Sequence, residues 1–398
     1  MIRLSQRLSV LPAYPLAELP AIKRRLIAQG VDVVDLGAGD SDYPPPRVGV
    51  EALRVALDNP AYSKYGFQQG LPEFRQAATA YMQRRFGQVF DPATETLPVI
   101  GSKEGLAHLP FAALNPVDVA IIPEPGYQAY IGGTVLAGGE PCIAALTPGA
   151  KFLVDLDAVP AATLARTRLL FLNYPNNPTA AIAPREYLER TVALCRKHDI
   201  LLAYDNAYVD ITFDGYVAPS IFEIPGARDV ALEFFSLSKS FSMTGWRLGW
   251  VAGRKELIAG LTRVKSYTDT GPFLAVQKAG AAVLDQAESL VAPIVMELQR
   301  RRDAGVAALR RAGFAVEAPK GAMYLWVALP PEVPSALFAR RALEDTGVVV
   351  LPGSGFGQAG EGFFRIALTV GPERLAEGVR RLATVLAALR EQGVGAGA

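Results

Sequence analysis

Short apolar runs rich in β-branched and aromatic residues alternate with helical patterns between residues 95 and 255. This alternation constrains the fold most, because parallel strands joined by crossover helices are buried on both faces and require such runs. Seven runs have the composition of strands: LPVIG, DVAIIP, EPCIAAL, RLLFLNYP, ILLAYD, ALEFFSL and LGWVAG. They predict an α/β fold with a doubly wound, mostly parallel sheet of seven strands covered by helices.

The pattern changes after residue 255. Two long helical patterns are followed by strand-like FAVEAP, MYLWVAL, VVVLP and FFRIAL, a succession typical of an α+β unit. We therefore predict a large domain over residues 46–279 and a smaller α+β domain built from residues 1–45 and 280–398. Within the large domain, PREYLERTVALCRKH predicts a helix with Pro184 in its first turn.

Composition argues against several classes of partner. The 40 Lys and Arg residues balance the 39 Asp and Glu residues, which favours neither nucleic acid nor an anionic membrane as a partner. We find no apolar run of membrane length and no signal-peptide pattern, and we expect a cytoplasmic protein. Two Cys and two His are too few for a disulfide framework or a zinc site, so we expect no metal.

Polar residues follow the predicted strands, at the edge of an open α/β sheet where ligands bind. GSKEGLAHL opens a helix with Gly and Ser102, which favours an anion site, although an ordinary turn has the same composition. EPGYQAY offers Tyr127 as a flat aromatic surface, or as a core residue. NNPTA is typical of a turn. Asp205 in DNAYVD should be exposed or paired with a cation, because burying a lone carboxylate is costly.

Lys239 follows the sixth predicted strand, in SLSKSFSMTGWRLGW. Desolvation there would favour the neutral, nucleophilic amine, although a surface lysine fits this segment taken alone. The coincidence of all these groups at successive strand ends indicates one ligand, pyridoxal phosphate. The aldehyde of this cofactor would react with the lysine, and its phosphate would bind at the helix start and to an arginine. Its ring would stack on the tyrosine, and its pyridine nitrogen would bind Asp205.

The motifs and their order resemble the fold-type I pyridoxal-phosphate-dependent aminotransferases of classes I and II over nearly the whole chain. SLSK…GWRLG is similar to the family's S-x-S-K…G-x-R-x-G, DNAY to D-x-A-Y, and NNPTA to N-P-T-G with Ala180 in place of Gly. GSKEGLAHL, MTGWRLGW, VKSYTDTGPF and AYPLAEL resemble the branch that contains LL-diaminopimelate and alanine aminotransferases.

The resemblance implies roles for individual residues. Lys239 would form the Schiff base and act as general base and acid, Asp205 would bind the pyridine nitrogen, and Tyr208 and Asn177 the phenolic oxygen. The other implied cofactor ligands are Ser102, Lys103, Glu104, Tyr127, Ser236, Ser238, Arg247 and, reaching into the neighbouring subunit, Tyr65. A homodimer with shared active sites is therefore implied.

On the substrate side, Arg365 in FFRIALT would clamp the α-carboxylate, for which its bidentate fork suits it. Asn177, Gly39 in DLGAGDSDY and Tyr14 would also lie beside the substrate. Tyr267 and Thr270 stand where Asn and Ser are usual in the branch. These two departures leave the identity of the amino donor open.

The implied activity is ping-pong transfer of an amino group from an amino acid to a 2-oxo acid, with 2-oxoglutarate as the expected acceptor. The donor could be LL-diaminopimelate, alanine, aspartate or an aromatic amino acid, and a β-lyase would use much of the same constellation. SLSK also fits the S-x-x-K signature of serine acylases, with Ser236 as nucleophile. No S-D-N or K-T-G follows, and we expect the segment to end a strand without opening a helix. A non-catalytic regulator of the same fold would need an added DNA-binding domain, for which we find no sequence.

Overall fold

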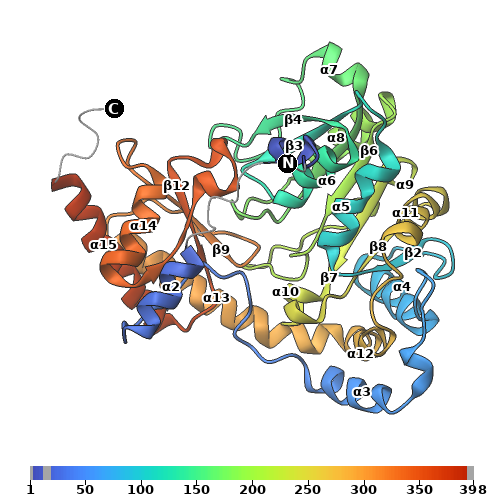
Figure 1. Cartoon of the computed structure of the whole chain (residues 1–398), viewed down its shortest axis with the longest axis horizontal. Helices are drawn as coiled ribbons and strands as arrows, with labels where there is room; N and C mark the ends of the chain where they lie inside the picture. The colour runs from blue at the N-terminus through green and yellow to red at the C-terminus, as the bar shows by residue number, and fades with distance from the viewer. Residues whose placement is uncertain (1–2, 12–18, 392–398) are drawn as a thin grey trace.

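The computed structural model describes residues 3–11 and 19–391, and a seven-stranded sheet forms the centre of its larger part (Figure 1). The strands run in the order β2-β8-β7-β6-β5-β3-β4, and β8 alone is antiparallel to its neighbours. Their bounds are β2 Thr96–Val99, β3 Val119–Glu124, β4 Glu140–Ala145, β5 Thr167–Leu172, β6 Leu201–Asp205, β7 Ala231–Ser236 and β8 Gly249–Gly253. The predicted sheet is confirmed, and each of the seven apolar runs supplies one strand.

Helices cover both faces of this sheet. Phe234 and Phe235 are consecutive in β7, so their side chains point to opposite faces, and they belong to different hydrophobic clusters. Phe235 stacks on Trp250 of the neighbouring strand with 4.7 Å between ring centroids. The helices of this part are α3 Arg47–Leu57, α4 Pro72–Phe86, α5 Ser102–Ala113, α6 Gln128–Ala137, α7 Ala161–Arg166, α8 Arg185–Lys197, α9 Ala227–Val230, α10 Leu237–Ser240, α11 Lys255–Thr268 and α12 Leu274–Leu284.

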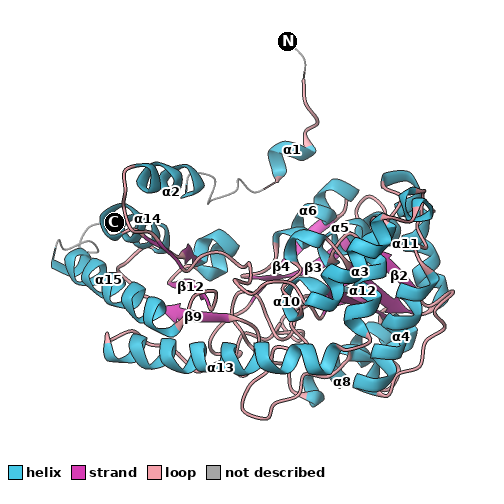
Figure 2. Ribbon diagram, turned by 90° about the horizontal axis from the view of Figure 1, so that it is seen from below, coloured by secondary structure: helices cyan, strands magenta, loops and turns pink. Residues whose placement is uncertain are grey.

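A smaller three-stranded antiparallel sheet has the order β11-β12-β9 and a third hydrophobic cluster around it. A separate pair, β1 with β10, is parallel and joins the N-terminal segment to this part. The elements of this part are α2 Leu19–Ala28, β1 Val34–Asp35, α13 Ala287–Arg311, β9 Tyr324–Ala328, α14 Ser335–Thr346, β10 Val348–Val349, β11 Leu351–Pro352, β12 Phe363–Ala367 and α15 Pro372–Glu391. The short helix α1 Arg7–Val10 lies instead against α6 of the larger part, where Arg7 Nη1 donates to the Leu136 carbonyl at 3.0 Å. Figure 2 shows the long α13 running alongside β9.

The smaller sheet, α2 and β1 come from residues that lie within the ranges we assign to a smaller domain, whereas α1, which those ranges include, contacts the larger part. The exact division stays a prediction. Among the described helices, none alone is long and apolar enough to cross a membrane; α12 and α13 pass that test only as a pair bent by 80°.

Two local predictions were wrong. Pro184 is the residue before α8 and has an extended backbone (φ −64°, ψ 153°), so the helix begins one residue later than predicted. FAVEAP forms no strand: its only ladder contact is an isolated bridge between Ala315 and Ala328. The apolar side chains of this segment instead pack against the core, where Phe314 lies 5.6 Å from Phe364 between ring centroids.

Candidate active site

A cavity of about 290 Å³ lies where β5, β6 and β7 end, between the large sheet and β12. It brings together residues from many parts of the chain, as expected where strand ends meet. The predicted site residues that line it are Gly39, Ser102, Lys103, Tyr127, Asn177, Asp205, Tyr208, Ser236, Ser238, Lys239, Arg247 and Arg365.

Three described residues of the predicted site do not line this cavity, and a fourth predicted residue cannot be placed. Tyr65 and Tyr267 lie on the surface, with 71% and 86% of each residue exposed, and their roles toward a neighbouring subunit stay predictions. Tyr14 lies outside the described residues. Glu104 lies in the first turn of α5, where its backbone N–H donates to the Gly101 carbonyl (3.2 Å), and its role toward a phosphate stays a prediction.

Lys239 lies in the short helix α10, directly after β7. Ser236 caps this helix, since its hydroxyl accepts from the Ser238 N–H at 3.2 Å. The half-buried Lys239 Nζ donates to the Gly39 carbonyl across the cavity at 2.6 Å. The expectation that SLSK opens no helix was therefore wrong: the segment ends a strand and opens a helical turn at once.

Asp205, the last residue of β6, is buried with 4% exposure. Its Oδ2 accepts from the Tyr130 hydroxyl at 2.7 Å, while the buried Oδ1 has no hydrogen-bond partner among the described residues. Burial raises the pKa of Asp205 to about 6, against the smaller opposing effects of the Tyr130 hydroxyl and the Ala207 backbone N–H. We expected Asp205 to be exposed or paired with a cation. It is buried, and its side-chain partner among the described residues is the neutral hydroxyl of Tyr130. A protonated pyridine nitrogen would supply the donor and the charge that Oδ1 lacks, so the site fits the predicted cofactor.

Two polar residues that the sequence did not single out position this part of the site. Tyr130 of α6 donates to Asp205, as described above. Asn173, directly after β5, donates through Nδ2 to the Asp205 carbonyl (2.7 Å) and accepts the Asn177 N–H at Oδ1 (2.7 Å). The position of Asn173 at a strand end, in LNYPNNP, was the available signal.

The start of α5 and Arg247 form the side of the cavity that suits an anion. Arg247 has a left-handed backbone (φ 55°), and its Nη1 donates to the Thr244 carbonyl at 2.8 Å. A Cβ at Gly101 would lie 2.4 Å from Arg247 Nη2, so only glycine admits the guanidinium here. Free N–H groups at the helix start, the guanidinium and the hydroxyls of Ser102, Ser236 and Ser238 are the donors that a phosphate group requires. We call residues 100–103 with Arg247 the phosphate cradle.

Arg365 of β12 forms the opposite side. The residue is 5% exposed; its Nη1 donates to Asn177 Oδ1 (2.7 Å) and its Nη2 to the Gly37 carbonyl (2.9 Å). Its guanidinium carbon lies 4.1 Å from the centroid of the Tyr324 ring and 4.8 Å from that of Phe356. The two rings hold the planar guanidinium in place, as a carboxylate-binding fork requires.

Tyr324 connects the two sides of the cavity, and sequence reasoning missed it because MYLWVAL indicated only a strand. Its hydroxyl lies 2.8 Å from the Tyr208 hydroxyl, while its ring packs on Arg365. Burial, and secondarily the contact with Tyr324, raise the pKa of Tyr208 well above its usual value. Tyr208 therefore stays a neutral hydroxyl that can donate to an oxygen of a bound molecule.

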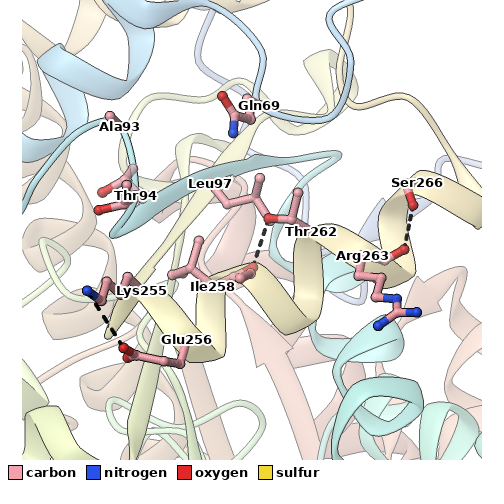
Figure 3. Close-up of a pocket in the computed structure, with 12 residues that line it drawn as sticks. Gln69, Ala93, Thr94, Leu97, Lys255, Glu256, Ile258, Thr262, Arg263 and Ser266 are labelled. Atoms are coloured by element: carbon pink, nitrogen blue, oxygen red, sulfur yellow. Dashed lines mark hydrogen bonds and ion pairs between the residues drawn. The ribbon is translucent and has the colours of Figure 1, made fainter.

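A larger hollow, of about 540 Å³, lies beside α11 and is shown in Figure 3. Two of its hydroxyls bond within α11: the Thr262 hydroxyl donates to the Ile258 carbonyl (2.8 Å) and the Ser266 hydroxyl to the Arg263 carbonyl (2.7 Å). Each of these hydroxyls donates to a backbone carbonyl of its own helix, so the two do not point together toward a ligand. The smaller cavity around Lys239 is therefore the candidate active site.

Comparisons with known proteins agree with this geometry. The family model for aminotransferase class I and II matches residues 31–382. The LL-diaminopimelate aminotransferase of Nitratidesulfovibrio vulgaris is 44% identical over 385 residues, which are 96% of this chain and 99% of the relative.

Solved structures are similar along the same length. Substrate-bound BacF from Bacillus subtilis superposes with a TM-score of 0.93 at 32% identity, covering 97% of this chain and 98% of BacF. A probable N-succinyldiaminopimelate aminotransferase from Thermus thermophilus gives a TM-score of 0.89 at 36% identity, covering 94% of this chain and all of that one (100%). The chain belongs to the class I and II aminotransferases, and it is a pyridoxal-phosphate-dependent enzyme that moves amino groups between amino acids and oxo acids.

Proposed function

We propose that the cavity around Lys239 is the aminotransferase active site and that pyridoxal phosphate is held between Lys239, Asp205 and the phosphate cradle. The unpartnered Oδ1 of Asp205 carries this proposal, because it lies in the cavity that Lys239 Nζ and Arg365 also line. A buried carboxylate oxygen without a donor is costly unless a cationic ligand supplies one.

The residues divide by the part of the cofactor that each suits. The phosphate cradle, with Ser236 and Ser238, would hold the phosphate, and Tyr127 would stack on the ring. Tyr208 and Asn177 would donate to the phenolic oxygen. When bound, the cofactor supplies an electrophilic carbon for the amino group and an electron sink that lets Cα lose its proton.

The chain's own side chains then orient the substrate and move one proton. Arg365 binds the α-carboxylate and so fixes the direction in which the Cα–H bond points. The Nζ of Lys239, once free of the cofactor, accepts the proton from Cα and returns it on the cofactor side, as general base and then general acid. Asp205 keeps the pyridine nitrogen protonated. A 2-oxo acid then binds through Arg365, and the same steps run in reverse.

We infer that the amino donor is a diamino dicarboxylic acid such as LL-diaminopimelate, because relatives at 42–44% identity carry that name. Tyr267 and Thr270 depart from the branch pattern, so alanine, aspartate and aromatic amino acids are the competing donors. A β-lyase reaction is the competing chemistry.

A panel of amino donors tests this inference. Each donor is supplied with 2-oxoglutarate or pyruvate, and the rates of formation of both products are measured. We expect LL-diaminopimelate with 2-oxoglutarate to give the highest kcat/KM, and equal amounts of new amino acid and new oxo acid. Another preferred donor would contradict the inferred substrate. Release of ammonia without a new amino acid would indicate lyase chemistry.

We further propose a homodimer in which Tyr65 and Tyr267 serve the neighbouring active site, because both are large, exposed and outside their own cavity. Mixing inactive Lys239→Ala subunits with inactive Tyr65→Ala subunits should restore part of the activity, since one of the two sites in a mixed dimer would have both residues. No recovery after subunit exchange would contradict shared sites.

The double role of Tyr324 gives a separate prediction. Tyr324→Phe keeps the ring on Arg365 and loses the hydroxyl that contacts Tyr208. We expect the pH midpoint of the bound cofactor's visible band to rise, because Tyr208 becomes a weaker donor, while the donor KM stays within about twofold. Tyr324→Leu should instead raise KM roughly 2- to 30-fold through loss of the cation–π contact. Equal effects of both variants on KM would refute the division of roles.

A further inference from the structure

Four side chains form a polar cluster beside the phosphate cradle, outside the cavity, around one buried lysine: Glu104, His108, Lys265 and Asp269. The side chain of Lys265 is fully buried (0% exposed), and we call the group the Lys265 cluster. Its Nζ donates to Glu104 Oε2 at 2.7 Å and to the two oxygens of Asp269 at 2.9 and 3.2 Å. Glu104 Oε1 lies 2.6 Å from His108 Nδ1. The ammonium is thus shared between α5 and the end of α11.

Glu104 connects the cluster to the phosphate cradle. Its Oε2 also accepts the backbone N–H of Ile100 at 2.9 Å. Ile100 directly precedes Gly101 and Ser102, and its carbonyl accepts from Arg247 Nη2 at 3.4 Å. A shift of Glu104 would therefore displace the backbone that forms the cradle.

Asp269 connects the same ammonium to the segment that follows α11. Its Oδ1 accepts the Gly271 N–H at 2.6 Å, and the Thr270 carbonyl accepts the Gln68 N–H at 3.3 Å. We call residues 267–271, which are the last two residues of α11 and the three residues after it, the selectivity loop; its first residue is the exposed Tyr267. Gln68 lies three residues after Tyr65. The hydrogen bond between Gln68 and Thr270 therefore connects the two segments that we assign to the neighbouring active site, one with Tyr65 and one with Tyr267.

A metal ion is not needed to explain the cluster. Ligand atoms of Glu104, His108 and Asp269 lie within 4.8 Å of one another, a spacing that could hold a metal. The Lys265 ammonium already occupies hydrogen-bonding positions on both carboxylates and supplies the positive charge. Burial acts to raise the pKa of Glu104, but hydrogen bonds from His108 and Lys265 outweigh it and lower that pKa. Glu104 is therefore a carboxylate, and the pair with Lys265 is ionic.

We propose that Lys265 is a positioning residue that fixes the phosphate cradle and the selectivity loop in one geometry. Cofactor affinity and recognition of the amino donor then depend on the same buried ammonium. This inference rests on the proposed function, because it takes the cradle to hold the cofactor phosphate and the loop to face a substrate. A buried ion pair contributes little net stability compared with an apolar replacement, which favours a role in geometry.

Three variants separate the two connections. Lys265→Met removes the shared cation, Glu104→Gln weakens the connection to the cradle, and Asp269→Asn weakens the connection to the loop while leaving the Lys265–Glu104 pair. Asp214→Asn is the matched control, because Asp214 accepts from Nη1 and Nη2 of the buried Arg302 (2.5 and 2.8 Å) and does not line the cavity. All four remove a charge from an ion pair whose cation is buried, so all should lower the melting temperature.

The measurements are the dissociation constant of pyridoxal phosphate, from its visible band on titration of the apoprotein, and the KM and kcat for the best donor. We expect Glu104→Gln to raise the dissociation constant about tenfold, Asp269→Asn to raise the donor KM about fivefold with kcat unchanged, and Lys265→Met to do both. Asp214→Asn should change neither quantity.

If Asp269→Asn and Glu104→Gln lower only the melting temperature, as the control does, the cluster is purely structural and the inference fails. Asp269→Asn keeps the test valid even if Lys265→Met does not fold. A wild-type protein that forms no visible band with pyridoxal phosphate would instead refute the proposed function, so the two failures are distinguishable.

Discussion

Replacing Lys239 with alanine should lower kcat/KM by at least about four orders of magnitude, because it removes both the covalent tether and the general base. General acid–base catalysis alone contributes up to about 10⁴-fold. Lys239 Nζ lies within the cavity, 2.6 Å from the Gly39 carbonyl. The other cavity lysine, Lys103, has its Nζ 5.8 Å from the Tyr127 ring centroid, on the cradle side. It is therefore a poor substitute.

Two measurements check this prediction. Steady-state assays give the loss of activity, and borohydride reduction followed by peptide mass analysis locates the lysine that carries the cofactor. Lys278→Ala is a suitable control, because this half-buried lysine does not line the cavity and its Nζ lies 3.9 Å from Glu73 Oε1. Full turnover by Lys239→Ala, or a labelled peptide that does not contain residue 239, would disprove the assignment.

Replacing Arg365 with lysine should lower kcat/KM for amino acids roughly 10²-fold, mainly through KM. Truncating a buried, hydrogen-bonded charge typically costs about 2–5 kcal/mol, and about 1.4 kcal/mol corresponds to tenfold in affinity. Lysine keeps the charge but loses the planar fork and the face that packs between Tyr324 and Phe356. It also cannot donate to Asn177 and Gly37 at once in the geometry that the guanidinium uses.

A substrate without a carboxylate provides the control for Arg365. The slow half-reaction of a simple primary amine should be nearly the same in the wild type and in Arg365→Lys, because no carboxylate is there to be bound. An unchanged KM for amino acids would show that the carboxylate is bound elsewhere.

Much of this fold could be predicted because its strands are buried on both faces. Such strands appear in the sequence as continuous apolar runs, and the polar residue at each end marks the ligand-binding edge. Asp205 and Lys239 were found in this way. FAVEAP was wrongly predicted to be a strand, because an apolar run can pack into a core through its side chains without joining a β-ladder.

The rest of the site depends on contacts between distant segments. The pairing of Tyr130 with Asp205 and that of Tyr324 with Tyr208 join residues 75 and 116 positions apart. No periodicity or local motif encodes such distances. Lys265 was equally hidden, because a lysine in a helix is usually solvated and its complete burial becomes visible only when α5 and α11 are packed together.

The supports of the two sides of the cavity differ. Asp205 and Ser236 end strands of the large sheet, whereas Arg365 lies on β12 of the small sheet and bonds to Gly37 of the N-terminal segment. In the proposed function, the group that would bind the pyridine nitrogen and the group that would bind the α-carboxylate are therefore supported by two different sheets. Because every amino acid substrate carries an α-carboxylate, both supports would serve all donors alike, and a change of donor would have to arise elsewhere, around the exposed Tyr267.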